Sequence, residues 1–304
     1  MSTYRTGVAD MYPHIYTVAQ SAYDGILRGI QALGESGAGK TENTKRIIEY
    51  VLECSAPCSS KQQHASNGVA NGYVDYGSSV GSDVVSSGVL LEAFGSARTT
   101  HNNNSSRFVG ALDLLEKSRV VNQNQGNRNF HVFYQLLSNA FSDEMRKQLL
   151  LTKPANQYKF LNQGNVAIDK EIDDAGDGLL TSRAMDRLGI TSDEKMDVYS
   201  IVAACLLIGE IKFGERSGLD MSYVDGNAEI DAVTTLLGVK SSRLIEALTQ
   251  PSIKVGDKVI RKNQNMQKSV FSAAALAKVL YERIFRWLLD KCNEAISEST
   301  SMLE

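Results

Sequence analysis

The segment GESGAGKT at residues 34–41 has the residue types and spacing needed to hold phosphate groups. It is a complete G-x-x-x-x-G-K-[ST] motif, in which glycines let successive backbone N–H groups point inward at phosphate oxygens. Lys40 would bring a positive charge to the outer phosphates, and Thr41 would offer a hydroxyl to Mg²⁺. An ordinary glycine-rich turn is the alternative. An amphipathic helix is predicted directly after the motif, however, where its positive dipole end would face the phosphates.

A second polar segment, HNNNSSRF at residues 101–108, precedes an apolar stretch. Its Asn and Ser side chains could donate hydrogen bonds to phosphate oxygens or bind Mg²⁺, and Arg107 could pair with a carboxylate or a phosphate. On this segment alone, a solvated polar turn is equally open. The sequence contains no Asn-Lys-x-Asp segment, which counts against a GTPase.

The elements that must position these groups are mostly helical. Apolar residues recur at helical spacing in several segments, which predicts helices over residues 14–27, 41–54, 127–141, 183–188, 198–208, 231–237, 242–248 and 271–289. The run IVAACLLIG at residues 201–209 is too short to span a membrane, so we expect a buried helix there. Residues 55–88 are rich in Ser, Gly, Asn and Gln, a composition typical of a flexible surface loop.

Composition and charge exclude several classes of protein. With 32 Lys and Arg against 35 Asp and Glu, the net charge of −3 argues against a nucleic-acid-binding protein. The amino terminus lacks the pattern of a secretory signal, and no segment has the roughly 18 apolar residues of a membrane span. Cys54 and Cys58 lack a second pair at zinc spacing, so we expect them, like Cys205 and Cys292, to be free thiols. These features predict a soluble cytosolic protein without nucleic acid or membrane partners.

Three smaller features favour structural roles. His131 lies in the apolar segment NFHVFYQ and is expected to be a packed core histidine rather than a catalytic base. Its aromatic neighbours Phe130, Phe133 and Tyr134 are also expected in the core. The Asp-x-x-Gly at residues 173–176 has no apolar strand before it, which predicts a surface turn.

Together the two polar segments resemble the myosin motor domain. GESGAGKTENTK is similar to the myosin phosphate loop residue for residue, and LLEAFGSARTTHNNNSSRF resembles the myosin helix that leads into switch I. PHIYTVAQSAY, LLEKSRVVNQNQGNRNFHVFYQLL, KFLNQG and IVAACLLIGEIKF fit the same family in the same order. The closing segment from Ala247 onward most resembles conventional, muscle-type class II myosin.

The resemblance implies an α/β fold. It comprises a P-loop NTPase core with a mixed central sheet, incomplete here, and a mainly helical upper subdomain. Residues 1–304 would form a partial motor domain, with the phosphate-loop region at 1–54, flexible loop 1 at 55–88, and switch I with the upper subdomain at 89–304.

The resemblance also implies the site residues, with ATP and Mg²⁺ as cofactors. Asn102 and Ser105 would hold the γ-phosphate and its attacking water, and Arg107 would close the pocket through a salt bridge to a switch II glutamate. These three are the expected catalytic residues. Thr41 and Ser106 would be the protein ligands of Mg²⁺. The residues expected to cradle and bind ATP are Gly34, Glu35, Ser36, Gly37, Ala38, Gly39, Lys40 and Thr41.

The implied function is Mg²⁺-dependent ATP hydrolysis coupled to movement along actin filaments, within a cytoplasmic, cytoskeletal myosin complex. Light-chain binding and tail dimerisation would belong only to a full-length chain. The alternative is a truncated, non-catalytic nucleotide-binding product that lacks switch II. It is suggested because the chain stops before the family's switch II, and because the segments around residues 23–34 and 108–114 are shorter than in the family. An unrelated P-loop ATPase is a third possibility, which the match at HNNNSSRF disfavours.

Overall fold

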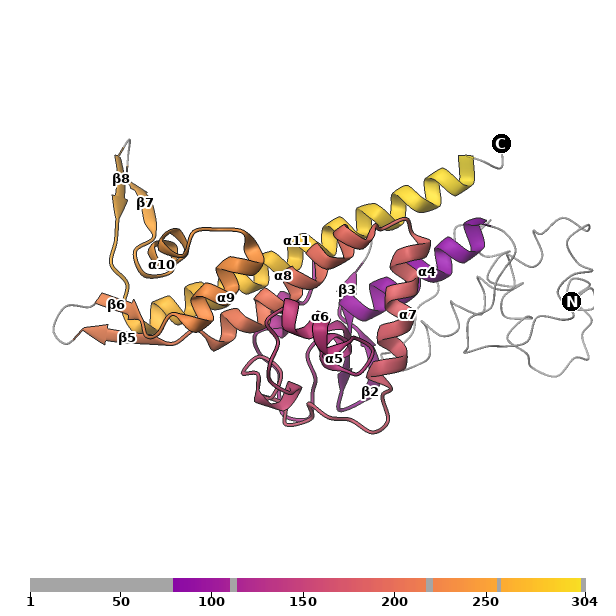
Figure 1. Ribbon diagram of the computed structural model, residues 1–304, viewed down its shortest axis with the longest axis horizontal. Helices are drawn as coiled ribbons and strands as arrows, with labels where there is room; N and C mark the ends of the chain where they lie inside the picture. The colour runs from indigo at the N-terminus through magenta and orange to yellow at the C-terminus, as the bar shows by residue number, and fades with distance from the viewer. Residues whose placement is uncertain (1–78, 110–113, 217–220, 256–257, 302–304) are drawn as a thin grey trace, which may run out of the picture. The chain divides into compact units, whose positions relative to one another are not determined.

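The computed structural model describes residues 79–109, 114–216, 221–255 and 258–301 (Figure 1). The helices are α4 (Ser79–Gly95), α5 (His131–Leu137), α6 (Asp143–Gln148), α7 (Asp174–Arg187), α8 (Ser192–Glu210), α9 (Ala228–Leu237), α10 (Ser241–Thr249) and α11 (Met266–Ser301), with 3-10 turns η3 (Lys117–Val120) and η4 (Ala155–Gln157). The strands are β1 (Ser96–Thr99), β2 (Asn102–Ser106), β3 (Phe108–Val109), β4 (Leu114–Leu115), β5 (Phe213–Arg216), β6 (Met221–Val224), β7 (Ser252–Val255) and β8 (Lys258–Arg261). The chain divides into two compact units, the first of residues 1–89, 187–189 and 291–304 and the second of residues 90–186 and 190–290.

Helix α4 begins inside the segment for which we expected a flexible loop. The expectation for residues 55–88 is therefore wrong over residues 79–88, which are helical, while residues 55–78 lie outside the described residues. The physical reason is that positions at helical spacing share one helix face, and small side chains such as serine fit into a closely packed interface even though they carry no apolar signal. The buried residues in this part of α4 include Ser82, Asp83, Ser86 and Ser87.

In the described part of the first unit, Asp83 is a buried carboxylate held by two donors. Its Oδ1 atom lies 2.9 Å from Nε of Arg187, and the Ser299 hydroxyl donates to Oδ2. A buried carboxylate is tolerated only when such partners replace water. This explains how the polar stripe of α4 can be buried.

In the second unit, α8 confirms the buried helix predicted from IVAACLLIG. The helix begins with a capping box in which the Thr191 hydroxyl accepts a hydrogen bond from Glu194 N, and the Glu194 carboxylate accepts one from Thr191 N. Residues 202–208 are all buried. Cys205 is a free thiol in this run, and burial raises its pKa to about 12.

Helix α11 lies beside α8 (Figure 1), and Sγ of Cys205 donates to the carbonyl oxygen of Ala277 at 3.5 Å. The helix confirms the prediction for residues 271–289 and extends it in both directions. Its Tyr281 ring is wholly buried and packs on aromatic rings from two other segments. The ring centroids lie 6.3, 5.0 and 5.1 Å from those of Phe94, Phe130 and Phe133, respectively.

Helix α5 is shorter than the helix predicted for residues 127–141. It begins at His131 because the residues before it are extended and pair with β1. Arg128 N donates to the carbonyl oxygen of Arg98 at 2.9 Å, and Phe130 forms a bridge with Ala97. The aromatic residues Phe130, Phe133 and Tyr134 are all buried, which confirms their predicted place in the core.

The Asp-x-x-Gly at residues 173–176 is not a surface turn, so that prediction is wrong. It starts α7, and Oδ1 of Asp173 accepts a hydrogen bond from Gly176 N at 3.0 Å, as an N-cap residue does. Asp174 is the first residue of the helix and pairs with a buried arginine. An Asp-rich segment is compatible with both a turn and a helix start, so the sequence alone could not separate them.

Within the described ranges, the strands form four separate two-stranded antiparallel sheets: β1–β2, β3–β4, β5–β6 and β7–β8. The β3–β4 pair has only two residues in each strand, at the place where the sequence is shorter than the family pattern. The prediction of a mixed central sheet involves segments outside these ranges. In the part of the chain that is described, no helix is long and apolar enough to cross a membrane.

Candidate switch I hairpin

The predicted switch I residues lie on the hairpin formed by β1 and β2. Its register places Thr99 opposite Asn102 at the turn. The Thr99 hydroxyl accepts hydrogen bonds from the backbone N–H groups of His101 and Asn102, at 3.4 and 3.2 Å. The polar-turn alternative is therefore wrong for residues 102–106, which form a strand whose turn is held closed by a threonine.

Two of the three expected catalytic residues contact each other. Nη2 of Arg107 donates to the Ser105 hydroxyl oxygen at 2.7 Å, and Ser105 is buried. The backbone of Arg107 is also fixed, because its N–H donates to the carbonyl oxygen of Gly95 at 2.8 Å. The structure thus joins a hydroxyl and a guanidinium at the end of β2.

The remaining switch I residues point elsewhere. Side chains alternate along a strand, so Ser106 faces away from Ser105; it is exposed, and its hydroxyl donates to the Phe108 carbonyl oxygen at 3.3 Å. The Asn102 carboxamide oxygen accepts a hydrogen bond from Asn104 N at 3.0 Å. In the described part of the chain, no hydrogen bond joins Asn102 to Ser105.

Arg107 has a carboxylate nearby, but only a loosely placed one. Its Nη1 atom lies 3.8 Å from Oε2 of Glu116, whereas Arg119 takes both oxygens of that carboxylate at 3.0 and 3.2 Å. Burial lowers the pKa of Arg107 and the neighbouring Arg119 lowers it further, while Glu116 opposes both. Nε of Arg107 is buried and has no hydrogen-bond partner among the described residues. The guanidinium therefore retains donor capacity.

The hairpin is attached to the aromatic core where α4 ends. The Tyr281 hydroxyl donates to the carbonyl oxygen of Phe94 at 2.9 Å, and the Phe108 ring meets Phe285 edge-on with centroids 5.3 Å apart. A Cβ atom on Gly95 would overlap the Phe108 ring, so glycine is needed at this junction. This packing fixes both ends of the hairpin.

The predicted phosphate-loop residues, Gly34, Glu35, Ser36, Gly37, Ala38, Gly39, Lys40 and Thr41, lie outside the described residues. Their placement against the hairpin therefore stays a prediction.

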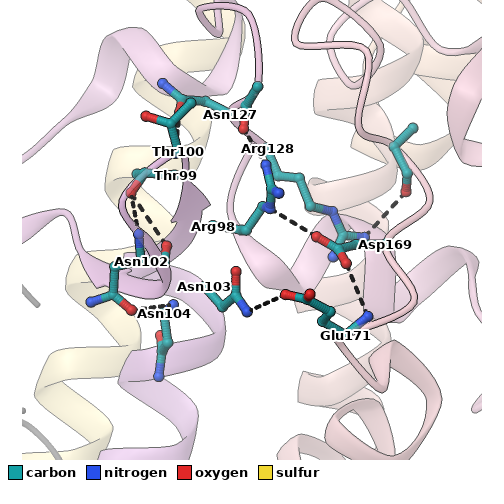
Figure 2. Close-up of polar contacts among 12 residues, drawn as sticks. Arg98, Thr99, Thr100, Asn102, Asn103, Asn104, Asn127, Arg128, Asp169 and Glu171 are labelled. Atoms are coloured by element: carbon teal, nitrogen blue, oxygen red, sulfur yellow. Dashed lines mark hydrogen bonds and ion pairs between the residues drawn. The ribbon is translucent and has the colours of Figure 1, made fainter.

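A polar network around the hairpin was not predicted from the sequence (Figure 2). Arg98 in β1 lies 2.8 Å from Oδ2 of Asp169, measured from Nε, and Asn103 in β2 donates from Nδ2 to Oε2 of Glu171 at 2.9 Å. The N–H of Thr100 donates to the side-chain oxygen of Asn127 at 3.0 Å. These residues were missed because their partners are far away in sequence and each looks like an ordinary surface side chain.

Arg128, which Figure 2 draws with this network, is a wholly buried cation. Its guanidinium binds both carboxylate oxygens of Asp174 at 3.1 and 2.6 Å and lies 3.6 Å from the centroid of the Tyr134 ring. Burial raises the pKa of Asp174, and Arg128 opposes that rise. A bidentate pair with a stacked ring is the arrangement in which a buried arginine is best tolerated.

His131 is confirmed as a core histidine. It is buried in α5, and burial together with the nearby Arg128 lowers its pKa to about 4. The imidazole is therefore neutral near pH 7, and it lies in the core rather than on the hairpin.

The hairpin has the chemistry expected of residues that hold Mg²⁺ and a phosphate. The exposed Ser106 hydroxyl retains lone pairs that suit a hard cation, and Arg107 retains donors that suit an anion. No group of three or more His, Cys, Asp or Glu side chains is placed to hold a metal among the described residues, so a protein-only metal cage is not found there. A site shared with the phosphates of a nucleotide fits this donor set.

Comparison with known families identifies the family of this chain. Residues 2–303 match the family described as the myosin head (motor domain). Proteins of this family are ATP-dependent motors that bind Mg²⁺ and ATP and act on actin. The matched range includes both the phosphate-loop motif and the β1–β2 hairpin, and the chain belongs to the myosin motor domain family.

Proposed function

We propose that this chain is the ATP-binding part of an actin-based motor that hydrolyses ATP with Mg²⁺ and couples hydrolysis to movement along actin filaments. The observation that carries the proposal is the Ser105–Arg107 contact on the β1–β2 hairpin, with Ser106 exposed beside it. The end of β2 and the residue that follows it thus present a guanidinium and two hydroxyls, one of which is the proposed Mg²⁺ ligand. The phosphate-loop motif at residues 34–41 of the same chain supplies the complementary half of the site.

In the proposed site, Lys40 binds the outer phosphates and the backbone of residues 34–39 cradles them. Thr41 and Ser106 hold Mg²⁺, which would neutralise charge on the phosphate oxygens. Asn102 and Ser105 orient the attacking water toward the γ-phosphate, and Arg107 excludes bulk water by pairing with a carboxylate across the pocket.

The partners and location follow from the same proposal. Actin filaments are the proposed track, and light chains and tail dimerisation would require a longer chain. The cytoplasm and the cytoskeleton are the proposed location. The segment from Ala247 onward favours the conventional, muscle-type class.

A second candidate is nucleotide binding without turnover. It is favoured by the carboxylate beside Arg107: Oε2 of Glu116, the residue after β4, lies 3.8 Å from Nη1 of Arg107 in place of a switch II glutamate. The Asp-x-x-Gly at residues 173–176, the pattern with which the family's switch II begins, starts α7 instead. Both candidates require the same phosphate loop and differ only in hydrolysis.

Steady-state phosphate release separates the two candidates. The purified chain is assayed with Mg·ATP, with and without filamentous actin, alongside Arg107→Ala and the exposed control Arg216→Ala. Hydrolysis at the proposed site predicts release that requires Mg²⁺ and falls at least about tenfold in Arg107→Ala, with nucleotide affinity kept within about threefold. Release should be unchanged in Arg216→Ala. Nucleotide binding without any release would instead establish the second candidate.

A further inference from the structure

Residues 167–174, which we name the acidic strap, contact both strands of the hairpin (Figure 2). Asp169 meets Arg98 in β1 at 2.8 Å, and Glu171 accepts a hydrogen bond from Asn103 in β2 at 2.9 Å. The two acidic residues are two positions apart on the strap. A single short segment therefore reaches both strands and can set the position of the hairpin as a unit.

The contact between Asp169 and Arg98 is the more buried of the two. The Asp169 side chain is 9% exposed and the Arg98 side chain 21% exposed, and Arg98 also donates to the carbonyl oxygen of Gly126. Ion pairs shielded from water are stronger and more sensitive to loss of one partner than fully exposed pairs. Asp169 therefore constrains Arg98 more strongly than Glu171 constrains the exposed Asn103.

The strap is itself anchored independently of the hairpin's tip. At its two ends the guanidinium of Arg128 binds the Asp174 carboxylate and the carbonyl oxygen of Ala167, the latter at 3.2 Å. Arg128 is wholly buried, and its backbone N–H donates to the carbonyl oxygen of Arg98 at 2.9 Å. A fixed strap can hold a neighbouring hairpin in place, whereas a loose one could only follow it.

We propose that Asp169 is a positioning residue that, through Arg98, fixes the β1–β2 hairpin and hence the residues 102–106 of β2. Its relevance to nucleotide rests on the proposed function, in which β2 faces the γ-phosphate. Loss of the Asp169 charge should therefore loosen β2 in the nucleotide-free protein. It should weaken binding of a nucleotide that carries a γ-phosphate more than binding of one that lacks it.

The test uses the full chain and the isosteric variant Asp169→Asn, with Asp197→Asn, an exposed carboxylate on α8, as the matched control. Hydrogen exchange of the backbone amides of residues 102–106 is measured without nucleotide, and affinities are measured for Mg·ADP and for the non-hydrolysable triphosphate Mg·AMPPNP. In Asp169→Asn we expect exchange about fivefold faster, AMPPNP affinity about fivefold weaker, and ADP affinity within about twofold of wild type. Asp197→Asn should change none of these.

The two measurements distinguish failure of the positioning role from failure of the proposed nucleotide function. Unchanged exchange in Asp169→Asn would overturn the positioning role, as would an equal loss of ADP and AMPPNP affinity, which general destabilisation would cause. Faster exchange in a chain whose wild type binds neither nucleotide would support the positioning contact and refute the proposed nucleotide function. The double variant Arg98→Asp with Asp169→Arg, which restores an opposite-charge pair, should recover slow exchange if the ion pair carries the effect.

Discussion

At the scale of single residues, the buried cation Arg128 organises its surroundings. Its charge is matched by Asp174 and stacked on Tyr134, whose pKa burial raises to about 12. The same cation disfavours a second positive charge nearby, which adds to burial in keeping His131 neutral. Burial is the larger cause of both pKa shifts, and Arg128 adds to the lowering at His131 while it opposes the rise at Tyr134. The same side chain also anchors the acidic strap through Asp174 and Ala167.

The low pKa of His131 predicts a loss of stability in mild acid. Its pKa is about 4 in the folded chain and about 6.5 when exposed, so below about pH 6.5 the unfolded chain binds a proton that the folded chain does not. The stabilising contribution is complete above about pH 6.5 and declines as the pH falls toward about 4. Between pH 7.5 and 5.5 this residue alone should cost about 1 kcal/mol of unfolding free energy.

Urea unfolding followed by the single tryptophan, Trp287, measures this effect at the two pH values. In His131→Gln, the unfolding free energy should fall by about 1 kcal/mol less between pH 7.5 and 5.5 than it does in wild type, whatever the overall stability of the variant. The control His101→Gln removes an exposed histidine and should keep the wild-type dependence. An identical pH dependence in wild type and His131→Gln would show that His131 is not the titrating group.

At the scale of elements, the loop that precedes the acidic strap and the loop before α5 meet through close backbone contact. Gly126 N donates to the carbonyl oxygen of Gly164 at 2.8 Å. A Cβ atom on Gly164 would overlap the carbonyl oxygen of Asn127 and lie 3.0 Å from that of Asn124. These neighbours are backbone atoms, which cannot move aside as a flexible side chain can.

Gly164→Ala is therefore expected to destabilise the second unit by about 1–3 kcal/mol, since two backbone segments must separate. Gly88→Ala is the matched control, because a Cβ atom there meets nothing within 4 Å and the residue lies inside α4. It should be neutral or stabilising by about 0.5–1 kcal/mol, since alanine favours a helix over glycine. Thermal unfolding compares the two variants, and equal melting temperatures would contradict the close contact at Gly164.

The elements that the sequence predicted well are those with local signals. Helices α8 and α11 have long apolar patterns, and the aromatic residues around α5 were correctly placed in the core. Helix α4 was missed over residues 79–88 because its buried stripe is largely serine. The start of α5 was predicted too early because Arg128 and Phe130 pair with β1, a long-range interaction that no local pattern contains.

In the candidate site too, the residues with a local signal were predicted and the long-range pairs were not. The motif HNNNSSRF identified Ser105 and Arg107, and the structure joins them at 2.7 Å. The pairs Arg98–Asp169 and Arg128–Asp174 span dozens of residues, so no spacing rule could have found them. An arginine inside the aromatic segment NRNFHVFY was the one available signal, since a buried charge there requires a partner.

At the scale of the whole molecule, the family match over residues 2–303 includes both motifs of the proposed nucleotide site. The hairpin is built on the aromatic core and held by the acidic strap. In the proposed site, this hairpin and the phosphate loop of the same chain bind Mg·ATP together. Such joint binding requires the charge of Lys40, which would bind the outer phosphates.

Titration of the purified chain with a fluorescent ATP analogue, with and without Mg²⁺, measures whether the proposed site binds nucleotide. Wild type should bind in a Mg²⁺-dependent manner. Lys40→Ala should bind more than about tenfold more weakly, a loss of at least about 1.4 kcal/mol, because it removes the positive charge at the outer phosphates. Lys61→Ala removes the same side chain outside both motifs and should bind like wild type. Equal affinities for wild type and Lys40→Ala, or no Mg²⁺-dependent binding by wild type, would contradict the proposed nucleotide site.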